Sequence, residues 1–210
     1  MKFLKSHKVT YSDKLFLGKY KYKIVIRTGV ASWFRGGDLD RVIACYERKD
    51  EYYYSRNITV ADINYAMKVH KFLGSIETWN IRVESPFLSI YLDNEKDLED
   101  LVKLSYECIK YISIPNPDTQ DKLVEGIVLV KNLDFGFKVT VGASHQNYIN
   151  FVNWCENNPR IRLPKRTKRD LSRNSSAGGG YFYVKDEKNL TMVKMFLGRT
   201  ITRVETVIQG

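Results

Sequence analysis

The alternation of apolar and polar residues predicts short strands and amphipathic helices that recur in one order. Residues 22–26 alternate as a strand does, and residues 137–141 show the same alternation 115 positions later. A glycine precedes each segment, at Gly18 and Gly136. Residues 60–73 and 147–156 have the apolar spacing of helices, and the short apolar segments 79–83 and 160–163 follow them as second strands.

A shift of 92 residues aligns a second pair of segments without a gap. Residues 90–98 fall on residues 182–190, so that Tyr91 matches Tyr183 and Leu98 matches Leu190. Both segments predict a buried strand, an acidic turn that can cap a helix, an amphipathic helix and a last strand. We therefore expect the matched residues to occupy equivalent places in two similar units.

The resulting order in each half is strand, helix, strand, strand, helix, strand, which is the order of the ferredoxin-like fold. We predict an α+β protein of two tandem ferredoxin-like units related by a diverged internal repeat. Apolar runs at 14–17 and 127–130 come before the first strands, so each unit should open with an extra hairpin strand. The first unit should span 1–115 with an insertion at 29–59, and the second 123–210 with a basic, Gly-rich insertion at 164–180.

Composition supports packed cores, since 43 % of the residues are hydrophobic. The sequence contains no run of about 18 apolar residues and no apolar signal segment after Met1, so we expect a soluble, cytoplasmic protein without membrane contact. Cys45, Cys108 and Cys155 are far apart in helix-like apolar patterns, which favours reduced core residues over disulfides or a metal site. No cofactor is expected.

The net charge of +10 is spread unevenly along the chain. Residues 1–37 carry +8 and residues 160–173 carry +6, which leaves −4 for the remainder. Two basic segments on a mildly acidic body create a directed field, so we expect a polyanion as partner.

The basic insertion and the strand after it hold most of the candidate binding residues. The cations could bind phosphates, and the Ser- and Gly-rich stretch 175–180 could let backbone N–H groups approach a phosphate. The rings of Tyr181, Phe182 and Tyr183 could stack on bases. These candidates are Arg160, Arg162, Lys165, Arg166, Lys168, Arg169, Arg173, Tyr181 and Tyr183. The alternative is a solvated hairpin connection.

The stretch Gly178-Gly-Gly-Tyr-Phe-Tyr-Val184 resembles the third-strand motif of RNA recognition modules. That motif places Gly and then aromatic residues on a central strand of the same topology. Its internal small residue is replaced here by Phe182, so the resemblance does not place the chain in that family.

A second cationic group precedes and enters the first strand. Period two aims Lys19, Lys21 and Lys23 to one face, with Tyr20 and Tyr22 on the other. These lysines either contact nucleic acid or protect a strand edge against aggregation.

Gly36-Gly37-Asp38-Leu39-Asp40 resembles the signature of GGDEF nucleotide cyclases, which set it on a hairpin with a further metal-binding acidic residue. Here the next residues predict a helix over 41–46, so we expect Asp38 to cap that helix and no metal site to form.

Ser144 and His145 are catalytic candidates, because they follow the first strand of the second unit and could act on a phosphodiester. Turn and helix-capping chemistry is the alternative. Two ferredoxin-like units, a basic face, a Gly-rich loop and a lone His are similar in architecture to the repeat-processing endoribonucleases of CRISPR systems. In that family the Gly-rich loop precedes the last strand of the second unit, whereas here it precedes the third, and only Gly198 precedes the last.

The residues together favour a non-enzymatic nucleic-acid-binding protein. Single-stranded RNA or DNA is favoured over duplex because aromatic residues accompany the charge, and the small two-unit build suits a viral or phage protein. The alternatives are a structural or assembly subunit with a basic surface that faces nucleic acid, and a metal-independent endoribonuclease. RNA versus DNA, and homo- or hetero-oligomer formation, stay open.

Overall fold

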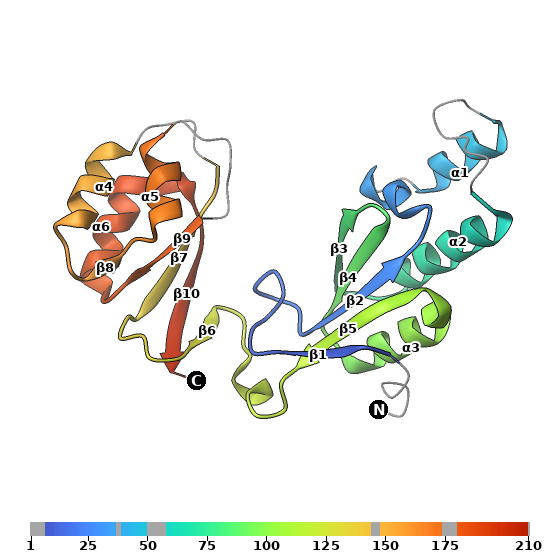
Figure 1. Ribbon diagram of the computed structural model, residues 1–210, viewed down its shortest axis with the longest axis horizontal. Coiled ribbons are helices and arrows are strands. Elements are labelled where there is room, and N and C mark those ends of the chain that lie inside the picture. Colours follow the sequence, from blue (N-terminus) through green and yellow to red (C-terminus); the bar gives the residue numbers. More distant parts are fainter. Residues whose placement is uncertain (1–6, 37–38, 50–57, 144–147, 174–179, 210) are drawn as a thin grey trace. The chain divides into compact units, whose positions relative to one another are not determined.

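The protein is α+β and divides into two compact units, Met1–Gln120 and Asp121–Gly210 (Figure 1). Each unit has its own five-stranded mixed sheet and its own apolar core. The computed structural model describes residues 7–36, 39–49, 58–143, 148–173 and 180–209. The predicted Asp38 cap, the candidates Ser144 and His145, and positions 175–179 of the Ser- and Gly-rich stretch lie outside these residues. Within the described ranges, no helix is both long and apolar enough to cross a membrane.

The first sheet has the strand order β1-β5-β2-β4-β3, with β1 parallel to β5 and the other neighbours antiparallel. Its strands are β1 (Val9–Ser12), β2 (Tyr22–Arg27), β3 (Trp79–Glu84), β4 (Phe87–Leu92) and β5 (Ile109–Pro115). Its helices are η2 (Ala31–Gly36), α1 (Leu39–Glu47), α2 (Val60–Gly74), α3 (Glu95–Ser105) and η3 (Tyr106–Cys108).

The second sheet has the order β6-β10-β7-β9-β8, with β6 parallel to β10 and the other neighbours antiparallel. Its strands are β6 (Ile127–Val130), β7 (Phe137–Val141), β8 (Ile161–Arg162), β9 (Gly180–Val184) and β10 (Ile201–Gln209). The helices of the second unit are α4 (Ile149–Glu156), α5 (Lys165–Ser172), α6 (Glu187–Leu197) and η5 (Gly198–Thr200), and η4 (Gln120–Lys122) crosses the sequence boundary between the units.

The predicted helices at 60–73 and 147–156 and the strand at 79–83 are confirmed within two residues by α2, α4 and β3. The registers of the two sheets also keep the two offsets of the sequence. Ile24 lies opposite Ile90 in the first sheet, and Val139 lies opposite Phe182 in the second. Tyr91 and Tyr183 lie on β4 and β9, and the matched leucines lie in α3 and α6.

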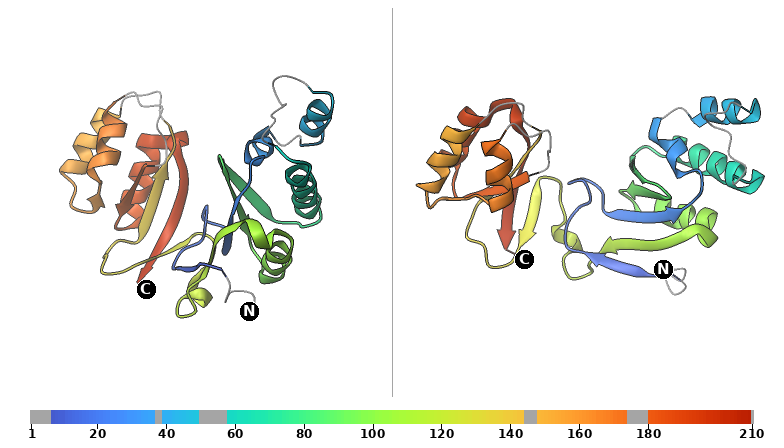
Figure 2. Two further views of the ribbon diagram at one scale, coloured as in Figure 1. Left: turned by 45° about the vertical axis from the view of Figure 1, so that its right-hand side comes forward. Right: turned by 45° about the horizontal axis from the view of Figure 1, so that its top comes forward.

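In each unit one face of the sheet is buried against helices, while the opposite face is built from the alternate residues of each strand. In the second unit Val139 and Phe182 are fully buried, and the ring centroids of Phe182 and Phe151 in α4 are 5.6 Å apart. In the first unit α2 and α3 cover one face of the sheet, as both views of Figure 2 show. Burying a side chain such as that of Val139 or Phe182 stabilises a fold by about 1.5–3 kcal/mol.

The predicted opening hairpins are wrong. The first extra strand is β1, not residues 14–17, and both β1 and β6 pair in parallel with the last strand of their unit. The central strands β2 and β7 already have neighbours on both sides, so no edge remains for a hairpin partner. The last strand of each unit pairs with β2 or β7 on one side, and β1 or β6 pairs with it on the other side. Residues 16–20 form a turn in which Phe16 N–H donates to Tyr20 O at 2.8 Å.

The prediction that residues 164–180 connect two strands as a loop is also wrong, because Lys165–Ser172 is the helix α5. Thr167 and Leu171 are four residues apart and buried, whereas Lys165, Arg166 and Arg169 of the same helix are exposed. The sequence therefore contains a helical spacing of buried residues, which the many charged residues around it made hard to recognise.

Helix α5 caps the edge of β9 where the two-residue strand β8 ends. The Thr167 Oγ1 hydroxyl donates to Tyr181 O at 2.9 Å and accepts from Tyr181 N–H at 3.2 Å. This side chain therefore satisfies backbone groups of Tyr181 that β8 is too short to pair with. The approach is close, because a Cβ on Gly180 would lie 3.1 Å from Thr167 Oγ1.

Replacing Thr167 with Val should lower the free energy of unfolding of the second unit by about 1–3 kcal/mol, because the backbone N–H and C=O of Tyr181 lose a part-buried hydrogen-bond partner. Urea denaturation followed by NMR signals of the second unit measures this. Thr191→Val is the control, because its hydroxyl bonds to Glu187 O on the exposed surface of α6. Equal stability of both variants would contradict the capping role.

Candidate nucleic-acid interface

The face of the second sheet that lies opposite α4 and α6 brings cations and tyrosines together, and we call it the open face. One row of directly opposed residues runs across four strands, and the next row runs across three. The first row is Arg162, Tyr183, Lys138 and Glu205, and the second is Tyr181, Thr140 and Arg203.

Strand alternation explains why these residues share a face. Phe182 and Val184 of β9 and Val139 of β7 pack into the helix-covered core. Their neighbours Tyr181, Tyr183 and Lys138 must then point to the other side, because successive side chains of a strand alternate.

A buried carboxylate joins the two cations at the centre of the open face. Glu205 Oε2 lies 3.1 Å from Lys138 Nζ and 3.4 Å from Arg203 Nε. The side chain of Glu205 is 7 % exposed, whereas those of Lys138 and Arg203 are 18 % and 37 % exposed. One carboxylate balances only one of two cations, so this cluster keeps a net positive charge that solvent can reach.

The two tyrosine rings are held in a fixed relation. Their centroids are 5.7 Å apart in an edge-to-face arrangement, and the Lys138 ammonium lies 5.3 Å from the centroid of the Tyr181 ring. Tyr183 also contacts Phe135, with ring centroids 6.4 Å apart. Tyr181 is 43 % exposed, so its ring is accessible from solvent.

The phenol of Tyr183 adds no anion to the open face. Burial, and then the neighbouring Tyr181, raise the pKa of Tyr183 above 10.0, although Arg162 opposes this shift. Tyr183 therefore stays uncharged at neutral pH.

Helix α5 borders this face, because Thr167 bonds to the backbone of Tyr181. Lys165, Arg166 and Arg169 are exposed on the helix, and Arg173 is exposed directly after it. The guanidinium groups of Arg166 and Arg169 lie 3.8 Å and 3.6 Å from the Asp170 carboxylate, and Lys168 pairs with Glu156 of α4. Most of the helix charge thus stays at the surface.

No protein-family model, curated protein or solved structure matches this chain. The significance of the open face therefore depends on its own geometry.

One predicted binding residue has a different partner. Arg160 Nη1 lies 2.7 Å from Asp186 Oδ2, and Asp186 in turn caps α6 by accepting from Asn189 N–H at 2.9 Å. The predicted strand over 160–163 is shorter in the structure, where β8 is Ile161–Arg162. Arg160 thus supports a helix cap instead of facing the tyrosines.

The predicted alternation of Lys19, Lys21 and Lys23 fails before β2 begins. Only Lys23 lies in a strand, while Tyr20 is buried with its ring 6.2 Å from that of Tyr91, on the same side of the sheet as Lys23. Lys23 Nζ donates to Tyr111 Oη at 2.9 Å. These lysines belong to the first unit and are not part of the open face.

Sequence reasoning missed Lys138 and Arg203. The signal for Lys138 was present, because residues 137–141 alternate and place Lys138 on the other face of the sheet from Val139. Arg203 carried no such signal, since β10 has an irregular register between Ile201 and Arg203.

Among the described residues, no group of three or more His, Cys, Asp or Glu side chains is placed to hold a metal ion. Cys45 and Cys155 are buried and free, and burial raises the pKa of Cys155 to about 12. This thiol stays protonated and is a poor nucleophile.

Replacing Glu205 with Gln should lower the free energy of unfolding of the second unit, because Lys138 and Arg203 would share a site without a counter-charge. Both cations reach water, so we expect about 1–2 kcal/mol, below the roughly 3–5 kcal/mol of a fully buried broken pair. Chemical denaturation of the variant at low salt measures the effect.

The control is Asp134→Asn, which removes a carboxylate 2.7 Å from Lys185 that is 87 % exposed in its side chain. Exposed pairs of this kind contribute at most about 1 kcal/mol. A destabilisation at Glu205 no larger than at Asp134 would contradict the role of Glu205 in holding the cluster.

The Asp186 cap makes stability depend on pH at the acidic end. Hydrogen bonds from Asn189, and then from Arg160, lower the pKa of Asp186 from 3.8 to about 2. Its contribution is therefore fully present above pH 3.8 and disappears as the pH falls toward 2. The difference in unfolding free energy between the native chain and Asp186→Asn should be constant from about pH 7 to 5 and vanish near pH 2. An unfolding free-energy difference that stays the same as the pH falls from about 5 to about 2 would exclude this linkage.

Proposed function

We propose that the second unit binds single-stranded nucleic acid across the open face of its sheet. The observation that carries this proposal is the placement of Tyr181 and Tyr183 in one surface with Arg162, Lys138 and Arg203, beside the basic helix α5.

Single strands fit this surface better than duplex. Stacking on a tyrosine needs a base whose face is free, and bases inside a duplex are stacked on their neighbours. An exposed ring on a sheet face offers such a platform. The cations around it lie where the backbone phosphates of a strand stacked on the tyrosines would pass.

The second unit is a better candidate than the first because its rings are accessible. Tyr91, at the position on β4 that matches Tyr183, is 5 % exposed and lies under Phe16 and Tyr20. Tyr181 of β9 is 43 % exposed. Tyr183 itself is half-buried, so the tyrosine that is covered in the first unit has a counterpart in the second that solvent partly reaches.

We also infer that the two units are diverged copies of one ferredoxin-like fold. The support is the corresponding strand order of the two sheets and the registers that keep offsets of 115 and 92 residues. On this hypothesis residues 29–59 and 164–180 are insertions into a common unit, and β1 and β6 are equivalent added edge strands.

Replacing Tyr181 and Tyr183 together with Leu should weaken binding of a single-stranded oligonucleotide of about 12 nucleotides by about 1–3 kcal/mol for each base that no longer stacks on a ring, with little effect on duplex. Fluorescence anisotropy with labelled oligonucleotides at fixed salt measures both. Tyr148→Leu in the same unit is the control, because this tyrosine packs against the helix-side core.

Replacing Lys165, Arg166, Lys168 and Arg169 with Gln should make the salt dependence of binding shallower, by about 0.7 in log–log slope for each phosphate that the variant no longer neutralises. The control is Lys188→Gln with Lys194→Gln on α6, which should leave the slope unchanged. Unaltered affinity in both the tyrosine and the cation variants, with the fold intact by circular dichroism, would reject the proposal and favour the assembly-subunit alternative.

A further inference from the structure

A pocket in the first unit has the composition of an anion site. It has a volume of about 380 Å³ and is lined by Arg27, Phe87, Glu107, Cys108, Ile109 and Lys110. This volume lies within the range of about 300–1,000 Å³ that is usual for small-molecule sites.

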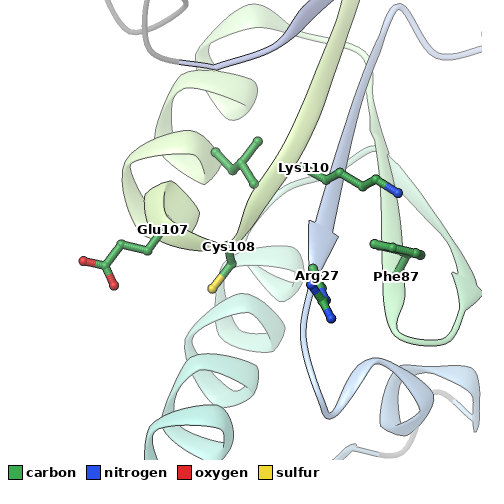
Figure 3. Close-up of a pocket in the computed structure, with 6 residues that line it drawn as sticks. Arg27, Phe87, Glu107, Cys108 and Lys110 are labelled. Carbon is green, nitrogen blue, oxygen red and sulfur yellow. The ribbon is translucent and has the colours of Figure 1, made fainter.

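Two cations reach the pocket from neighbouring strands. Arg27 ends β2, and Lys110 extends from β5 across β2 toward Phe87, as Figure 3 shows. The Lys110 Nζ atom lies 3.8 Å from the centroid of the Phe87 ring. An aromatic face carries no full charge, so Lys110 keeps its positive charge and its hydrogen-bond donors.

Among the described residues, no carboxylate neutralises either cation of the pocket. Within the part of the chain that the structure describes, no ion pair includes Arg27 or Lys110. Glu107 lines the pocket, but its carboxylate points away from both cations in Figure 3. Two like charges that share a hollow repel one another, and a bound anion would relieve this repulsion.

The remaining lining adds no negative charge. Burial, and then the nearby Glu107 and Asp62, raise the pKa of Cys108 above 9.0, so its thiol is protonated at neutral pH. Arg27 lies on the central strand β2, where protection of a sheet edge does not explain its charge.

We propose that this pocket binds a phosphate monoester. Such a group carries about −1.5 to −2 charges at pH 7, which matches two cations. The Arg27 guanidinium would contact two oxygens and the Lys110 ammonium a third, while Phe87 forms an apolar wall for the organic part. A free nucleotide and the 5′ end of a nucleic-acid strand present the same chemistry. The site is in the first unit and does not depend on the proposed function of the second.

The test is a titration of the ¹⁵N-labelled full chain with inorganic phosphate, AMP and adenosine at constant ionic strength. Phosphate and AMP should produce saturable shifts at the amides of Arg27 and Lys110, and adenosine should not. The double variant Arg27→Gln, Lys110→Gln should weaken binding at least about tenfold, as expected when charge-assisted hydrogen bonds are removed. Phe87→Leu should weaken AMP binding more than phosphate binding.

The matched control is Arg82→Gln with Lys103→Gln, which removes two cations of the same unit that are already paired with Glu84 and Asp100. The absence of saturable shifts with phosphate and AMP, or equal weakening in both double variants, would overturn the proposal.

Oligonucleotides with a 5′-phosphate or a 5′-hydroxyl distinguish the two sources. Tighter binding of the 5′-phosphate that disappears in Arg27→Gln, Lys110→Gln identifies a strand end, and saturation by AMP alone identifies a free nucleotide. The tyrosine variants of the second unit should leave phosphate binding unchanged, so failure of one proposal is separable from failure of the other.

Discussion

The burial of Phe182 is the constraint on which the open face depends. Its ring packs against Phe151 inside the second core, and the period of a strand then forces Tyr181 and Tyr183 to the opposite side. The same logic on β7 buries Val139 and turns Lys138 outward. Packing in the core thus decides which side chains meet on the surface, although none of the surface residues contributes much to the core.

The charge on that surface is arranged by a buried group. Glu205 holds Lys138 and Arg203 in place, and Lys138 in turn lies over the ring of Tyr181. A carboxylate in a cationic surface lowers its net charge, but it also lets two cations stand close together at the centre of a sheet. The outer charge on α5 is positioned by a different device, the double hydrogen bond between Thr167 and the backbone of Tyr181.

The two units use similar positions differently. Lys23 and Lys138 lie on the central strands and face a tyrosine of the neighbouring strand in each sheet. In the first unit Phe16 and Tyr20 cover that tyrosine, and the cations at the other end of β2 and β5 surround a pocket instead. Two sheets with a corresponding strand order therefore present an open aromatic surface in one unit and a cationic pocket in the other.

The sequence by itself determined the α+β class, most helices and strands, and the candidates Arg162, Tyr181 and Tyr183, because alternation and helical spacing are local patterns. It did not determine the place of β1 and β6, since strand pairing depends on which edges the other strands leave open. It also did not predict helix α5, because the buried residues of that helix are only Thr167 and Leu171 among many cations. Only the tertiary structure decided that Arg160 supports a helix cap and that Lys138, Arg203 and Glu205 meet, because these contacts join segments that are far apart in the chain.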